Sequence, residues 1–146
     1  MGIFNRIFGS FGGGPRIARR LTINDLSSEL DKLKSGYTEF DFLGITSNGT
    51  DCIYFVQAGE KFHIEYEAMT TEQLPYIEKL KTFGEANGFE TSMSSYGNKP
   101  HFASVEDAPV ISIKTDSDIT MTVEIARSIQ NTVFCNDDTT EYDVVP

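Results

Sequence analysis

The sequence predicts an α+β domain in which an antiparallel sheet packs against three helices. The expected order is α-β-β-β-α-β-β-α, followed by a short closing strand over residues 140–145. Three β-like runs follow one another between residues 37 and 69, with only two short turns between them, and helical patterns lie on both sides. Strands joined by tight turns pair antiparallel, so we expect a three-strand meander extended by one to three further strands.

The first helix is expected between Thr22 and Gly36. Thr22 is a capping residue type, and Asp25 places a carboxylate in the first turn, where the helix dipole favours it. Gly36 suits the position just past the helix end. Four apolar side chains at helical spacing form the buried stripe: Ile23, Leu26, Leu30 and Leu33.

The three runs of the meander differ in their expected burial. Residues 37–45 alternate, with two phenylalanines on one face and acidic side chains on the other, which is typical of a half-buried strand. Residues 52–56 are apolar at every position, which predicts the central strand. Residues 62–68 alternate cleanly between a core face and a wet face.

The second helix is predicted within residues 70–88. Pro75 is tolerated only in the first turn, so the regular helix should begin between Thr71 and Leu74. Gly88 then supplies the C-terminal cap. Its apolar side chains form the buried face: Leu74, Ile77, Leu80 and Phe83.

The C-terminal part is predicted to add strands and a third helix. Residues 89–95 are polar, as edge strands often are, whereas residues 109–114 form a clear strand. Asp116 or Ser117 is expected to cap the third helix, which runs from about residue 118 to residue 134.

Length and charge fit a single acidic domain. The 12 basic and 22 acidic side chains give a net charge of −10, which argues against nucleic acid as a partner because phosphates require Lys and Arg. Residues 1–20 hold four arginines and no acid, so residues 21–146 carry 8 basic and 22 acidic groups, a net charge of −14. We therefore expect an N-terminal segment, residues 1–20, followed by one acidic α+β domain, residues 21–146, with basic or neutral partners.

The N-terminal segment carries one apolar stripe ended by a glycine-rich joint at residues 12–15. The stripe consists of side chains at helical spacing: Ile3, Phe4, Ile7, Phe8 and Phe11. A helix this short is marginal alone in water. Three destinations stay open: packing on this domain or within a dimer, docking on a membrane surface or a partner, and disorder.

The cysteines and the hydropathy predict a cytoplasmic protein. Cys52 and Cys135 lie in apolar surroundings, which indicates buried free thiols in a reducing compartment and not a disulfide framework. No run is long enough to span a membrane, and there is no signal peptide. The protein would be peripheral to the membrane if residues 1–20 bind lipid.

The chemically active residue types do not form an active-site pattern. His63, Glu65 and Glu67 share one strand face and could hold a metal or a general base, but no further Cys or His lies near them in the sequence. Residues 116–118 lack the later ligands of a calcium loop, and a helix cap explains them. We therefore expect no enzymatic activity, no metal and no cofactor.

The order of elements resembles that of the small type III secretion chaperones and the related bacterial chaperone-like regulatory proteins. The resemblance rests on residues 109–145, where a strand, a capped amphipathic helix and a closing Glu141-Tyr142-Asp143-Val144-Val145 follow each other closely, and it covers roughly residues 20–145. It implies a homodimer that holds an extended segment of a partner protein on apolar surface patches, without catalysis.

These observations predict a non-catalytic protein-binding module, chaperone-like or an adaptor. The candidate partner-binding residues are apolar and periodic: Ile3, Phe4, Ile7, Phe8, Phe11, Met121, Ile125 and Ile129. The aromatic face of the meander is a further candidate, and all of these residues are also core candidates. Two alternatives stay open: an acidic inhibitor or immunity-type protein that neutralises a basic partner, and a membrane-surface accessory protein anchored by residues 1–20.

Overall fold

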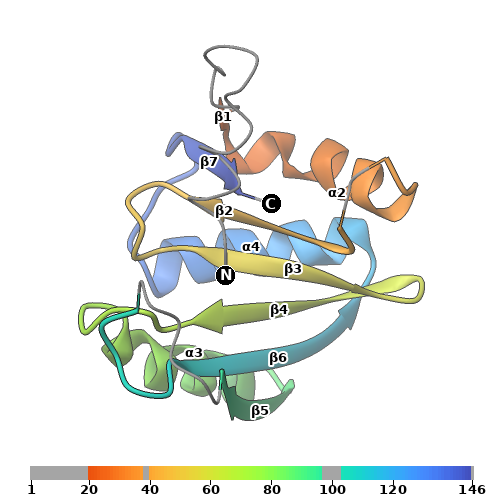
Figure 1. Ribbon diagram of the computed structural model, residues 1–146. Helices are drawn as coiled ribbons and strands as arrows, with labels where there is room; N and C mark the ends of the chain where they lie inside the picture. The colour runs from red at the N-terminus through yellow and green to blue at the C-terminus, as the bar shows by residue number, and fades with distance from the viewer. Residues whose placement is uncertain (1–19, 38–39, 97–102, 146) are drawn as a thin grey trace, which may run out of the picture.

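A computed structural model describes residues 20–37, 40–96 and 103–145 of the chain. These residues form one seven-stranded antiparallel sheet and three α-helices (Figure 1). The predicted α+β class and the approximate order of the elements are confirmed. The spatial order of the strands, β1-β7-β2-β3-β4-β6-β5, places the meander in the middle of the sheet.

The sheet contains four strands besides the meander, one more than the most we expected. Its strands are β1 (Arg20–Leu21), β2 (Phe42–Thr46), β3 (Ile53–Ala58), β4 (Lys61–Glu67), β5 (Glu90–Ser95), β6 (Pro109–Ser117) and β7 (Tyr142–Val145). The additional strand, β1, pairs with β7 and forms one edge of the sheet. Two residues cannot show a period, which is why the sequence pattern did not predict it.

All three helices lie on one face of the sheet (Figure 1). They are α2 (Leu26–Lys34), α3 (Leu74–Ala86) and α4 (Ile119–Thr132). A 3₁₀ turn, η2 (Ile23–Asp25), precedes α2, so Thr22 caps this turn and the α-helix begins later than predicted. Helix α3 begins within the predicted range, with Pro75 in its first turn.

The cap of α4 differs from the prediction. Asp118, and not Asp116 or Ser117, is the N-cap, and its carboxylate accepts a hydrogen bond from the Met121 amide at 2.8 Å. Strand β6 continues through Ser117, three residues beyond the predicted end. The helix therefore begins directly after a long strand, without an intervening loop.

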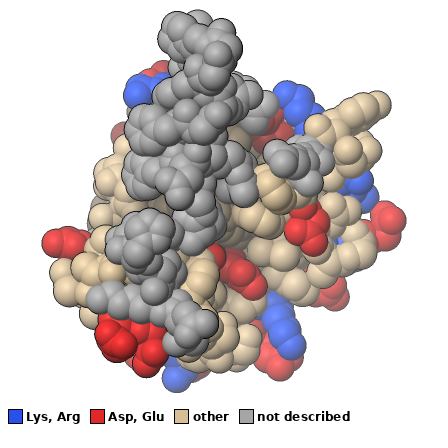
Figure 2. All heavy atoms as spheres, in the orientation of Figure 1, with Lys and Arg blue, Asp and Glu red and all other residues tan. Residues whose placement is uncertain are grey.

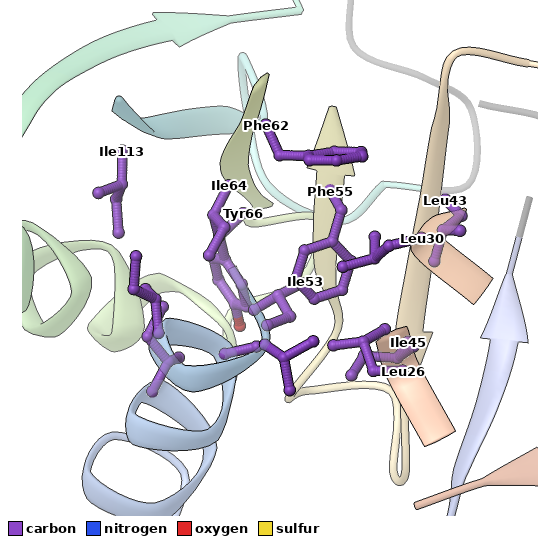
Figure 3. Close-up of a cluster of buried hydrophobic side chains, with 14 of the residues drawn as sticks. Leu26, Leu30, Leu43, Ile45, Ile53, Phe55, Phe62, Ile64, Tyr66 and Ile113 are labelled. Atoms are coloured by element: carbon purple, nitrogen blue, oxygen red, sulfur yellow. The ribbon is translucent and has the colours of Figure 1, made fainter. Parts of the chain in front are cut away.

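The hydrophobic core lies between this face of the sheet and the helices (Figure 3). Because side chains alternate along a strand, every second residue of β4 points into it, and Phe62, Ile64 and Tyr66 are at most 1% exposed. In β3 the adjacent residues Tyr54 and Phe55 are both buried. The prediction that the uniformly apolar run forms the central strand is thus confirmed, because β3 is the fourth of seven strands.

A buried carboxylate fastens the β2–β3 turn to the C-terminal part of the chain. Asp51 is fully buried, and its side chain accepts hydrogen bonds from the Thr46 hydroxyl and the Ser47 amide, each at 2.8 Å. The side-chain amide of Asn136 donates to the same carboxylate at 2.8 Å, and the side-chain amide of Gln130 in α4 donates to the Asp51 backbone carbonyl. Donors from the β2–β3 turn and from the C-terminal part of the chain thus meet at one residue and fix the position of the chain after α4.

Glycine permits the close packing of α3 on the edge strand β5. A Cβ atom on Gly84 would lie only 2.6 Å from Cγ2 of Thr91. No ordinary side-chain contact is that short, so only glycine fits with the helix and strand in their present positions.

Candidate functional site

The candidate binding residues named from the sequence have different surroundings. Met121 of α4 is 53% exposed, whereas Ile125 and Ile129 of the same helix are buried in the hydrophobic core. Residues 3–11, which carry the N-terminal stripe, lie outside the described residues. In the described part of α4, the stripe therefore faces the sheet, and Met121 alone of the three reaches the surface.

The face of the sheet opposite the helices carries an aromatic strip. The Phe40 and Phe42 rings lie 5.4 Å apart, and Phe42 makes an edge-to-face contact with Tyr54 at 6.2 Å. Tyr54 stands opposite Gly44, where a Cβ atom would lie 2.8 Å from the tyrosine ring. The aromatic face predicted for the meander therefore exists, and a glycine lets its central ring lie flat on the neighbouring strand.

The polar residues of β4 extend this face toward β6. The Nδ1 atom of His63 accepts a long hydrogen bond, 3.4 Å, from the Asp116 amide. Glu65 and Glu67 follow it at two-residue spacing and are partly buried. Within residues 20–37, 40–96 and 103–145, no group of three or more His, Cys, Asp or Glu side chains could hold a metal ion.

Desolvation dominates the electrostatics of this polar strip. It raises the pKa of Glu65, and the nearby His63 opposes this rise. It also raises the pKa of Glu67, where a hydrogen bond with Tyr96 acts in the opposite direction and the charge of Glu65 adds to the rise. These carboxyls therefore hold their protons more strongly than free glutamates.

The thiol on this face is unreactive in character. Burial raises the pKa of Cys52 to about 12. Because the thiolate is the nucleophilic form, a thiol with this pKa is almost entirely protonated at neutral pH. In the described residues, the strip thus places a protonated, largely buried thiol beside the buried Tyr54 ring and two partly buried glutamates.

Two shallow hollows, of about 510 and 570 Å³ and widely open to solvent, lie near the C-terminal ends of α3 and α4 and share Cys135 as a lining residue. We call their union the α3–α4 groove. The apolar part of its lining comes from Phe83, Ala86, Val133 and Cys135.

Packing against the hydrophobic core and a hydrogen-bonded turn after α4 hold the residues that line the α3–α4 groove in position. Phe83 and Val133 pack with their inner sides against the hydrophobic core, while Ala86 and Cys135 are exposed. Cys135 has a φ angle of 60°, which turns the chain away from α4. The backbone N–H of Asn136 then donates to the Gln130 backbone carbonyl at 2.8 Å. The connection of Asn136 to Asp51 described above holds this turn in place.

One end of the groove is acidic. Asp137 and Asp138 line the larger hollow together with Asn131, Cys135 and Asn136. Hydrogen bonds from the Thr139 hydroxyl and amide lower the pKa of Asp137, so this carboxylate is ionised at neutral pH. Asp138 forms an ion pair with Arg127 at 2.8 Å. At the other end Glu78 and Lys79 border the smaller hollow, and the Lys79 ammonium lies 5.0 Å from the centre of the Tyr76 ring.

Charge on the opposite side of the molecule is dispersed. Figure 2 shows acidic side chains in several small groups, with basic side chains between them, on the face that it presents. The described helices include none that is long and apolar enough to cross a membrane.

Sequence reasoning did not predict the groove, because its residues come from the ends of two helices that are distant in the chain. The available signal was an interruption of the pattern: the stripe of α4 ends at Val133, and after Phe134 the chain continues with the mostly polar run Cys135-Asn136-Asp137-Asp138. Comparisons of the chain with protein-family models, with curated proteins and with solved structures found no match, so the geometry alone supports a functional proposal.

Proposed function

We propose that this protein is a non-catalytic protein-binding module, of the chaperone-like or adaptor type, that holds a segment of another protein in the α3–α4 groove. The observation that carries the proposal is the lining of the groove, where a partly buried apolar floor at Phe83 and Val133 meets an acidic end at Asp137. Apolar side chains of the partner would gain from burial on this floor.

The lining also defines the chemistry of the partner. An ionised Asp137 at the end of the groove favours a Lys or Arg in the bound segment, next to one or two apolar side chains. The strongly acidic composition of the domain would steer a basic segment toward the protein at low ionic strength. Both hollows are open to solvent along their length, which suits a peptide segment better than an enclosed small molecule.

Selection of random phage-displayed peptides on the full chain tests this proposal. The blocking variant is Ala86→Arg, which fills the groove from an exposed position at the end of α3, where a positive charge suits the helix dipole. The matched control is Thr71→Arg, which makes the same change of charge at an exposed position before α3. Selected peptides should be apolar and basic, and should lose at least tenfold in affinity for the blocking variant only.

Mapping of the bound peptide gives the decisive result. Amide chemical shifts should change at residues 82–87 and 131–138 when a selected peptide is added. Peptides that bind both variants equally, or shift changes confined to another surface, would contradict the groove as the binding site.

A further inference from the structure

Strand β5 ends the sheet on the side opposite β1, and its outer edge is unpaired among the described residues. It has one neighbour, β6, and no described residue pairs with its other side. Five of its six residues are exposed, and Met93 is 49% exposed. Edge strands are commonly protected by lysine, proline or a bulge, but the only charged residue of β5 is Glu90, at its first position.

The pairing of β6 reveals which backbone groups of β5 point outward. The Pro109 carbonyl accepts a hydrogen bond from the Ala68 amide at 2.8 Å, so Pro109 faces the β4 side of the sheet. Because the direction of the backbone groups alternates along a strand, the N–H and C=O of Val110 point toward β5, where Val110 is paired with Ser94. The amides and carbonyls of Ser94 and Ser92 therefore point inward. Those of the residues between and beside them point outward: Thr91, Met93 and Ser95.

This arrangement is self-complementary. We propose that β5 pairs with β5 of a second copy of this chain, antiparallel and about a two-fold axis at Met93. In this register Met93 faces Met93 and Thr91 faces Ser95, because the outward residues are symmetrically placed about Met93. The three outward N–H groups and three outward carbonyls of each copy all find partners, and an isologous interface requires exactly such self-matching of one patch.

The charged and apolar side chains of β5 are also compatible with the proposed antiparallel register. Glu90 faces Tyr96 of the second copy, so no like charges stand directly opposite each other. Met93 points to the helical side, as its pairing with the core residue Ile111 shows, and would be buried against its own copy. Both copies then carry their helices on the same side of one continuous sheet.

The net charge determines how the association depends on salt. Each chain carries −10, so two copies repel one another and added salt should tighten the dimer by screening this repulsion. Binding of a basic segment in the α3–α4 groove uses other residues. The inference therefore goes beyond the proposed function, and either proposal can fail while the other holds.

Sedimentation equilibrium of the full chain over a range of concentrations tests the inference. Met93→Lys places two ammonium groups opposite each other at the axis and should weaken the dimer at least tenfold. Met121→Lys is the matched control, because it makes the same change at a methionine of similar exposure, 53%, on the helix α4. It should leave the dimer unchanged.

A mixture of variants makes the test specific for a second copy. Met93→Glu alone should also weaken association, but a mixture of the Met93→Lys and Met93→Glu chains should restore a dimer, because opposite charges then meet at the axis. Circular dichroism checks that each variant is folded. Three results would overturn the inference: a wild-type chain that stays monomeric up to about 1 mM, equal weakening by Met93→Lys and Met121→Lys, or no recovery in the mixture.

Discussion

The two edges of the sheet are built in opposite ways. The described residues of the β1 edge are Arg20 and Leu21, and Arg20 forms ion pairs with Asp143 at 3.2 Å and Glu141 at 3.7 Å. The β5 edge is six residues long and carries one charge at its first position. Charged side chains on an edge strand hinder its pairing with another strand, whereas an edge with little charge is less protected. We therefore place the proposed strand pairing on the β5 edge.

The two sides of the sheet are also held by different interactions. On the β1 side, the buried Asp51 joins the β2–β3 turn to Asn136, a few residues before β7. On the β5 side, the close contact between Gly84 of α3 and Thr91 fixes the strand. A polar network is lost as a unit when its central residue is removed, whereas a packing contact can adapt by small shifts. The four substitutions below compare the loss of stability or association that follows when these interactions are removed.

Asp51→Ala should have the largest effect, because it removes the buried acceptor of the hydrogen bonds from Thr46, Ser47 and Asn136. We expect a loss of about 3 kcal/mol in the free energy of unfolding, measured by urea denaturation. Tyr142→Phe is the control on the same side of the sheet, since no described residue meets the buried Tyr142 hydroxyl at full hydrogen-bond geometry, although Asn136 lies close enough to oppose the rise that burial causes in its pKa. It should be neutral or slightly stabilising, and equal losses in both variants would contradict the role of Asp51.

Gly84→Ala should have an intermediate effect on the β5 side. The new methyl group would meet Thr91 Cγ2, which we expect to outweigh the better helix propensity of alanine and to give a net loss of about 1 kcal/mol. Thr91→Ser removes that methyl group, so Gly84→Ala should become neutral or stabilising in the Thr91→Ser background. Denaturant unfolding of the four chains of this cycle measures the coupling, and additive effects would exclude the proposed clash.

Glu67→Gln should have a smaller effect that depends on pH. The pKa of Glu67 is raised in the folded protein, mainly by desolvation, so ionisation of this carboxyl lowers stability as pH rises through the window above the ordinary glutamate value. The isosteric amide avoids this loss. Melting temperatures should therefore be higher for the variant than for the wild type at pH 7, with no difference at about pH 3, where both side chains are neutral. A constant difference at all pH values would exclude titration as the cause.

Arg20→Ala should have the smallest effect, because its ion pairs are exposed. We expect about 0.5 kcal/mol or less at low salt and no measurable difference in high salt, measured by denaturant unfolding. The dimer constant should stay unchanged, since Arg20 lies at the edge opposite β5. A variant that associates more strongly would indicate that Arg20 protects the β1 edge, and would sharpen the comparison between the two edges.

The sequence was sufficient to predict elements whose burial follows a period. The alternation of Phe62, Ile64 and Tyr66 predicted the buried face of β4, and Pro75 limited the beginning of α3 to within a turn. The cap of α4 was misplaced because Asp116, Ser117 and Asp118 are all capping residue types, and only the length of β6 distinguishes them. The groove was not predicted because no local period connects Phe83 with Val133.

The sequence by itself determined the fold class, the meander and the acidic character of the chain, because hydrophobic period and charge are local properties that can be counted along the chain. Tertiary structure alone decided which strands became edges, which buried carboxylate received donors from both parts of the chain, and where the helix ends left a groove. These features depend on residues far apart in the sequence, such as Asp51 and Asn136 or Gly84 and Thr91, and their chemistry arises only when folding brings them into contact.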